Sequence, residues 1–254
     1  MSVPITRARL YLSGMDESAA RLAAETGCGY EITAFSYAPN LTDAALFARV
    51  QAEMTGIRSF WLHAPFAELT PCAIDPDVRA VAMARFRQTA ALAARLGVHQ
   101  LVIHGGYIPL VYFPEWYVEQ SVLFWREFLP ALPPDFEIAL ENVMEPGPEL
   151  LVDIVKAVGD ARLGLCLDVG HANTVVSQTP PLDWLAPMQP WLRHVHLHDN
   201  HGELDEHLPP GAGSMPISAL LERLAQLPDV TITLETRSAA RSLRYLQERG
   251  WLEP

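Results

Sequence analysis

Cysteine is scarce in this chain, and its arrangement excludes a disulfide scaffold. The 254 residues contain three cysteines, Cys28, Cys72 and Cys166, which lie far apart without CxxC spacing. An odd number of widely separated cysteines argues against a disulfide framework. We therefore expect three reduced thiols that pack as small apolar side chains.

Long apolar runs are also missing. No stretch approaches the roughly 18 to 20 apolar residues that span a bilayer. The N-terminal segment MSVPITRARLYLS lacks the charged, apolar and small-residue regions of a signal peptide. These absences predict a cytoplasmic protein that does not associate with a membrane.

Basic residues are few, which bears on the class of partner. Lys and Arg number 18 against 30 Asp and Glu, so the formal net charge is −12. The densest basic stretch, Arg237 to Arg249, is interrupted by apolar residues like an ordinary surface helix. An acidic chain without a basic patch repels polyanions, so we expect a small-molecule substrate and no nucleic acid partner. Nothing in the sequence indicates an oligomeric state.

Short apolar runs alternate with helical patterns along the whole chain. Strands are expected at residues 8–13, 30–35, 59–64, 100–105, 137–142, 163–168, 194–199 and 230–235, and helical segments at 16–27, 41–56, 75–97, 114–129, 146–159, 180–192, 216–228 and 237–250. This alternation indicates parallel strands joined by right-handed crossovers. Eight strands in a chain of this length predict one (β/α)8 TIM barrel domain over residues 1–254. An open doubly wound sheet is the alternative, but no GxGxxG follows the first strand.

Six successive expected strands end on a residue type that binds divalent metals: His63, His104, Glu141, Asp168, His196 and Glu235. The C-terminal strand ends of a barrel meet at one mouth, where barrel enzymes do their chemistry. Imidazole nitrogen and carboxylate oxygen are ligands for zinc and manganese. Three further candidates, His171, Asp205 and His207, follow the sixth and seventh strands. The pattern predicts a metal centre at the mouth.

Each candidate also has a simpler interpretation, because a lone histidine is more often a hydrogen-bonded core residue and a lone carboxylate is more often a helix cap. Glu141, Asp168 and Glu235 follow apolar segments, however, where carboxylates are costly to bury without a cation. His194, His196 and His198 share one strand face. We expect His194, nearer the closed end, to be a packing residue. Candidate substrate contacts are Tyr107, Trp116, His198 and Arg237.

The series LHAP, IHGG, ENV, LDVGHAN, HLHDNHGELDEHLPPGAG and LET resembles the xylose isomerase-like barrel superfamily, which contains endonuclease IV and sugar isomerases and epimerases. The resemblance runs in order from about residue 59 to 236, and the HLHD to GAG segment is its most specific part. As in the endonuclease IV branch, it implies three zinc ions. The first would be held by His63, His104 and Glu141, the second by Glu141, Asp168, His196 and Glu235, and the third by His171, Asp205 and His207.

The epimerase branch of the same superfamily implies a different use of these residues. There a single metal ion, Zn²⁺ or Mn²⁺, would occupy the second site, and Glu141 and Glu235 would act as a catalytic acid/base pair. His63, His104, Asp205 and His207 would then be substrate contacts. Unlike endonuclease IV, the chain is acidic and has no recognisable basic or intercalating loop residues for gripping abasic DNA.

Two functions therefore stay open. One is hydrolysis of a small phosphate-containing metabolite with two to three zinc ions, in which Glu141 and Glu235 are again essential. The other is single-metal isomerisation or epimerisation of a sugar or sugar phosphate. A non-catalytic metabolite-binding barrel is disfavoured because binding alone does not need a full ligand set, and a DNA endonuclease is disfavoured by charge.

The charge balance generates a first testable prediction. Three zinc ions would reduce the net charge from −12 only to about −6, so we expect weak or no binding to duplex DNA at physiological salt. Fluorescence anisotropy with an intact and an abasic duplex measures this directly. Tight binding with a steep salt dependence would contradict the prediction.

Overall fold

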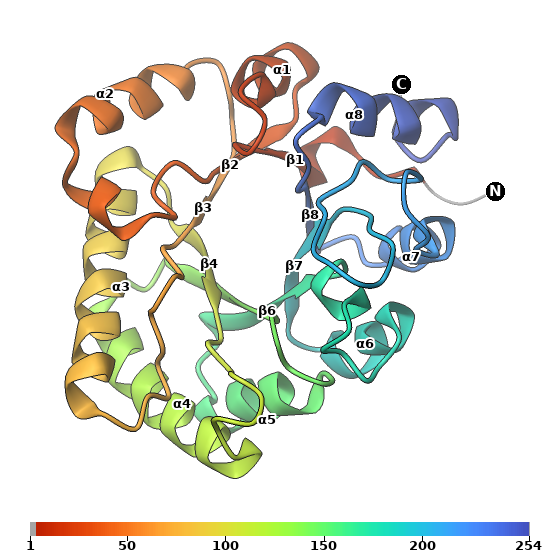
Figure 1. Ribbon diagram of the computed structural model, residues 1–254. Coiled ribbons are helices and arrows are strands. Elements are labelled where there is room, and N and C mark those ends of the chain that lie inside the picture. Colours follow the sequence, from red (N-terminus) through yellow and green to blue (C-terminus); the bar gives the residue numbers. More distant parts are fainter. Residues whose placement is uncertain (1–3, 254) are drawn as a thin grey trace.

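Eight short parallel strands close into a barrel inside a ring of eight α-helices in the computed structural model, which describes residues 4–253 (Figure 1). The strands pair in chain order, and β1 closes the ring against β8 through the Leu10↔Ile232 register. Their bounds are β1 (Leu10–Ser13), β2 (Gly29–Ile32), β3 (Phe60–His63), β4 (Gln100–His104), β5 (Glu137–Glu141), β6 (Leu163–Asp168), β7 (Leu192–Leu197) and β8 (Thr231–Leu234).

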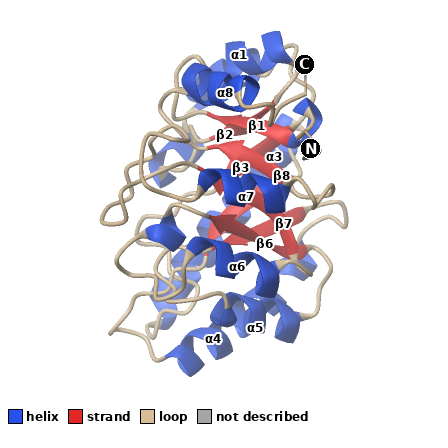
Figure 2. Ribbon diagram, turned by 90° about the vertical axis from the view of Figure 1, so that its right-hand side faces the viewer, coloured by secondary structure: helices blue, strands red, loops and turns tan. Residues whose placement is uncertain are grey.

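One α-helix follows each strand, and Figure 2 shows the helices outside the strands. The helices are α1 (Ala19–Thr26), α2 (Ala44–Glu53), α3 (Pro76–Leu96), α4 (Pro114–Phe128), α5 (Glu149–Val158), α6 (Pro181–Met188), α7 (Ile217–Leu224) and α8 (Ala239–Glu248). Short 3-10 helices are η1 (Arg7–Arg9), η2 (Ala38–Thr42), η3 (Leu129–Ala131) and η4 (His171–Asn173). The predicted (β/α)8 fold is confirmed, and the expected boundaries differ by no more than four residues.

Helix ends follow local chemistry in the sequence. Asp43 caps α2 by accepting hydrogen bonds from the backbone N–H groups of Ala45 and Leu46. Asp75 caps α3 in the same way, ahead of Pro76 in the first turn. Gly97 ends α3 in the left-handed conformation, which suits a residue without a side chain. Among residues 4–253, no helix has the length and apolar character needed to cross a membrane.

The period of two along each strand separates two apolar regions. Outward-facing residues such as Leu10, Leu12 and Ile32 belong to the large core between the strands and the helices. Inward-facing residues form a separate small cluster of Tyr11, Trp61, Val102, Ala139 and Cys166. The barrel interior therefore has only a thin apolar layer, and the interior towards the C-terminal strand ends is left to polar side chains.

Two aromatic rings fill most of that thin layer. A Cβ atom on Gly29 would lie 2.4 Å from the Tyr11 ring, so the absence of a side chain there makes room for the ring. Trp61 is 1% exposed, lies 4.4 Å from the His194 ring between centroids, and donates its indole N–H to Thr231 Oγ1 at 3.1 Å. Trp61 therefore forms the apolar floor of the barrel, directly beneath the polar side chains of the interior.

Truncating the Trp61 side chain should destabilise the fold. We expect Trp61→Ala to lower the free energy of unfolding by about 3 to 5 kcal/mol, because it leaves a cavity inside the barrel. Denaturant titration followed by circular dichroism measures the change. Phe113→Ala removes a ring that is 80% exposed and should change stability by less than about 0.5 kcal/mol. An unchanged unfolding midpoint for Trp61→Ala would refute this view of the barrel floor.

Candidate metal centre

The strand ends bring all six expected ligand-type side chains to the inside of the barrel mouth. The last residues of β3 to β6 are His63, His104, Glu141 and Asp168, His196 is the last but one residue of β7, and Glu235 follows β8 directly. Successive strands in a barrel are neighbours, so residues far apart in the chain meet here. The three loop candidates, His171, Asp205 and His207, close on the same group from η4 and the loop after β7.

Glu141 joins two groups of possible ligands. Its Oε2 atom lies 3.3 Å from His63 Nε2 and 3.2 Å from His104 Nε2. Its Oε1 atom lies 3.0 Å from His196 Nδ1. The side chain is 1% exposed. One buried carboxylate is therefore shared between a group with His63 and His104 and a central group with His196.

The central group contains three carboxylates and one imidazole: Glu141, Asp168, His196 and Glu235, with one ligand atom of each within 4.8 Å of the others. His196 Nδ1 lies 3.4 Å from Glu235 Oε2 and 3.7 Å from Asp168 Oδ2. Burial opposes ionisation of Glu141, but the charges of His196 and His104 hold its pKa well below the usual range. Burial raises the pKa of Glu235 to about 7, against the opposing charge of His196. The negative charges therefore exceed what one imidazole can balance.

Unpartnered oxygen atoms show that this group fits a cation. Glu141 Oε2 and Glu235 Oε2 are buried without a hydrogen-bond partner. Buried carboxylate oxygens normally accept hydrogen bonds or bind a cation, because desolvation is otherwise uncompensated. Among residues 4–253, no Lys or Arg side chain is buried. The donor set of imidazole nitrogen and carboxylate oxygen is that of zinc and manganese sites.

Three histidines that lie outside the central group, here called the outer histidines, are oriented by the backbone in the same way. In each, Nδ1 meets a backbone carbonyl: His63 meets Ala64 O at 2.8 Å, His171 meets Asn142 O at 2.9 Å, and His207 meets Glu235 O at 3.1 Å. A carbonyl can only accept, so we assign the proton to Nδ1. The Nε2 lone pair is then free for a metal, and in each ring Nε2 faces a carboxylate oxygen.

Asp205 is the centre of the third group. Its Oδ2 atom lies 2.7 Å from His207 Nε2 and 3.4 Å from His171 Nε2. Its Oδ1 atom lies 3.6 Å from His198 Nε2. The compact triplet is His198, Asp205 and His207, whereas the sequence-based grouping placed His171 with the latter two. His171 contacts Asp205 but stands further from the rest of that triplet.

The loop that carries Asp205 and His207 is organised by a residue that sequence reasoning did not select. Asp199 is fully buried and accepts hydrogen bonds from the backbone N–H groups of Asn200, Gly211, Gly213 and Met215 at 2.9 to 3.1 Å. A single carboxylate thus ties both ends of residues 199–215 together. Its position at the end of the expected strand 194–199, before a Gly- and Pro-rich segment, was the available signal.

His198, which the sequence suggested as a substrate contact, is fully buried. The side chain has no exposed surface, its Nε2 atom lies 3.1 Å from both oxygens of Asp168, and its ring stacks on His207. A Cβ on Gly170 would lie 1.8 Å from the His198 ring, so the ring lies against bare backbone. The position of its Nε2 atom groups His198 with Asp205 and His207 as a possible ligand.

The other substrate-contact candidates are spread around the rim. Tyr107 is buried and packs on Tyr117 at 4.9 Å between ring centroids, so its ring stabilises the fourth loop. Trp116 is half-buried and donates its indole N–H to Cys72 O at 2.8 Å. Arg237 is exposed. Phe66, which the sequence interpretation omitted, is 44% exposed and stacks on His104 at 4.6 Å, beside the His63 and His104 group.

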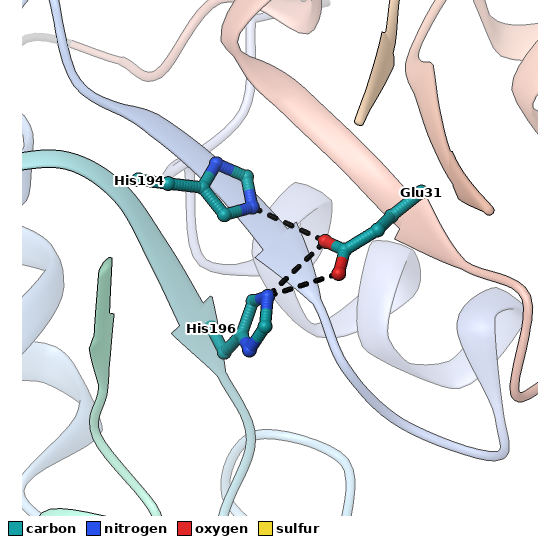
Figure 3. A group of neighbouring side chains, drawn as sticks. All are labelled: Glu31, His194 and His196. Atoms are coloured by element: carbon teal, nitrogen blue, oxygen red, sulfur yellow. Dashed lines mark hydrogen bonds and ion pairs between the residues drawn. The ribbon is translucent and has the colours of Figure 1, made fainter. Parts of the chain in front are cut away.

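Glu31 is the main residue of the interior that the sequence interpretation missed. It lies on β2, is fully buried, and contacts His194 and His196 (Figure 3). His194 packs between Trp61 and this carboxylate, and burial lowers its pKa to about 4. The available signal was an acidic residue on the inward face of the strand YEITAF, two residues after Gly29.

The rim of the mouth is poor in cations. The eight segments that connect each strand to its following α-helix contain one arginine, Arg237, and no lysine. Most of the exposed large apolar side chains, including Ile108, Leu110, Phe113 and Leu204, lie in these segments. The loops therefore offer no basic surface for a long polyanion.

Comparison with known proteins places these features in a family. A family model described as a xylose isomerase-like TIM barrel matches residues 20–254. A structure titled as a D-tagatose 3-epimerase-like protein superimposes with a TM-score of 0.79 at 25% identity, covering 94% of this chain and 96% of that one. The TTHB071 protein of Thermus thermophilus, in crystals soaked with ZnCl2, superimposes with a TM-score of 0.75 at 30% identity, covering 95% and 97%.

Sequence similarity also reaches the endonuclease branch. A probable endonuclease 4 of Mycobacterium ulcerans is 24% identical over 202 residues, which are 74% of this chain and 78% of that protein. The family model covers nearly the whole barrel, and the resemblance expected from the strand-end motifs is confirmed. The chain belongs to the xylose isomerase-like TIM barrel family.

Proposed function

We propose that this protein is a multinuclear zinc enzyme that hydrolyses a small phosphate-containing metabolite. The observation that carries the proposal is the sharing of buried Glu141 between the His63 and His104 group and the central group. His63 is 4% exposed, and Glu141 Oε2, which it faces, has no hydrogen-bond partner. Buried histidines aimed at an unpartnered carboxylate oxygen are better placed to bind a metal than a substrate.

Each group of residues has a distinct role in this proposal. Glu141, Asp168, His196 and Glu235 would hold a central ion, and His63 and His104 would hold a second with Glu141. Asp205 and His207 would hold a third, with His171 or His198 as the remaining ligand. Zinc in such sites supplies positive charge and lowers the pKa of a coordinated water. Phe66 lies beside the His104 ring, where it would cover a bound substrate.

Charge favours a phosphate group at the mouth when all three groups are filled. Three zinc ions carry six positive charges against four negative charges on Glu141, Asp168, Asp205 and Glu235, which leaves about +2. Since the rim contains a single arginine, the metal ions would be the main source of positive charge for the substrate. A small phosphate ester fits this arrangement better than a nucleic acid does.

A second candidate is single-metal epimerisation of a neutral ketose. It is supported by the similarity to the D-tagatose 3-epimerase-like structure and by the cation-poor rim, which suits an uncharged sugar. In this case Glu141 and Glu235, which share the central group, would move protons at the substrate carbons. The flanking histidines and Asp205 would contact substrate hydroxyl groups.

Zinc stoichiometry separates the two candidates. Protein saturated with zinc and freed of loose metal should retain two to three equivalents, because three ligand groups share the mouth. Elemental analysis gives the number, and anomalous scattering from crystals gives the positions. One ion bound by Glu141, Asp168, His196 and Glu235 would instead favour the epimerase, and ketose epimerisation should then be assayed before phosphoester hydrolysis.

Removing the charge of either central glutamate should abolish turnover. We expect Glu141→Gln and Glu235→Gln to lower the rate on a responsive phosphate ester or ketose by about 100-fold or more, with the fold retained. Glu141→Gln should also reduce the zinc content, because Glu141 belongs to two groups. The matched control is Glu137→Gln, at the opposite end of β5 where Glu137 pairs with Arg193. Full activity in either central variant would rule out the proposed site.

A further inference from the structure

His196 lies between two sets of carboxylates. Its Nδ1 atom faces Glu141, Glu235 and Asp168 of the central group. Its Nε2 atom faces Glu31, at 3.0 Å from Oε1 and 3.2 Å from Oε2 (Figure 3). A neutral imidazole carries one proton and one lone pair on its two nitrogens, so only one of these sides can receive the lone pair.

The hydrogen bonds of the neighbouring His194 leave His196 as the histidine that donates a ring N–H to Glu31. We assign the Thr231 hydroxyl proton to Arg193 O, 3.2 Å away, so that the Thr231 oxygen accepts from His194 Nδ1 at 2.6 Å. With its proton on Nδ1, neutral His194 presents only a lone pair on Nε2, which lies 2.8 Å from the Thr233 hydroxyl. The single Thr233 hydroxyl proton goes either to Glu31 Oε2 or to His194 Nε2, and in both cases the ring donor that faces Glu31 is the Nε2–H of His196.

His196 is oriented differently from the outer histidines. His63, His171 and His207 each direct a ring N–H to a backbone carbonyl, whereas the outward nitrogen of His196 meets a carboxylate. A carboxylate is the stronger acceptor, so it fixes the tautomer and raises the basicity of the opposite nitrogen. Neither side chain of this pair has exposed surface.

We propose that Glu31 is a positioning residue that holds the proton of His196 on Nε2 and thereby turns the Nδ1 lone pair towards the central metal group. The assignment rests on the metal site proposed above and is independent of which reaction that site performs. It gives a role to an interior carboxylate that supplies no ligand to the three metal groups at the mouth.

A fourth metal ion held by Glu31, His194 and His196 would be the competing explanation, since these residues also form a compact group. Hydrogen bonding argues against it. Thr233 Oγ1 contacts both Glu31 Oε2 and His194 Nε2, and His194 Nδ1 is bound to Thr231. The Thr233 hydroxyl therefore already hydrogen-bonds at the same atoms, Glu31 Oε2 and His194 Nε2, that would have to share an ion.

The test is the zinc affinity of Glu31→Gln, a change that keeps the shape of the side chain and removes its charge. Competition against a chromophoric chelator should show about 10- to 100-fold weaker binding of one zinc equivalent, with the number of equivalents at saturation unchanged. The matched control is Glu145→Gln, because Glu145 is buried and bonded to Tyr117 but belongs to none of the ligand groups. It should bind zinc like the unmodified protein.

A second measurement uses the unmodified protein and depends on no variant. Long-range proton–nitrogen NMR spectra of zinc-loaded protein with labelled histidine should show His196 protonated at Nε2 and not at Nδ1. A proton on Nδ1, or equal zinc affinity in folded Glu31→Gln, would overturn the assignment. Loss of one whole zinc equivalent in Glu31→Gln would show instead that Glu31 is itself a zinc ligand. Failure to bind zinc at His196 would reject the metal site as well, whereas failure of phosphoester hydrolysis alone would leave the role of Glu31 standing.

Discussion

Burial of carboxylates without buried cationic side chains is the constraint on which the rest of this structure depends. Glu31, Glu141, Asp168 and Glu235 lie inside the barrel, and no Lys or Arg among residues 4–253 is buried with them. Histidines supply the only nearby positive charge, and two carboxylate oxygens of the central group still have no hydrogen-bond partner. An interior of this kind costs stability unless cations bind.

The fold accommodates this interior by confining apolar packing to two places. The large core lies outside the strands, and a thin layer built on Trp61 and Tyr11 closes the barrel beneath the polar groups. Hydrogen bonds to the backbone then fix the candidate ligands that surround the central group. Carbonyl groups orient three histidines, and Asp199 holds the long loop that brings Asp205 and His207 over the mouth. Rigid strands and a tied loop give the preorganised ligand geometry that a metal site needs.

The two candidate reactions use the same central group and differ in what surrounds it. Hydrolysis of a phosphate ester requires the flanking histidines and Asp205 as ligands, whereas epimerisation uses them as substrate contacts. The burial of His63 and the orientation of the His63, His104 and His207 rings towards carboxylate oxygens favour the first use. The rim, with one arginine and several exposed apolar side chains, favours a small substrate in both cases. A family that contains both epimerase-like and endonuclease-like relatives is consistent with such a change of role on one scaffold.

The sequence alone determined the barrel and the row of ligand-type residues at the strand ends, because both depend on local patterns. Strands and helices have periods of two and 3.6 residues, and a ligand at a strand end must lie at the mouth once eight parallel strands close. The tertiary structure decided what depends on contacts between distant strands. Glu31 and His196 are 165 residues apart in the chain. His198 lies against the bare backbone of Gly170, and in this position it is grouped with Asp205 and His207. Barrel closure and loop packing create these contacts, and no periodicity in the chain encodes them.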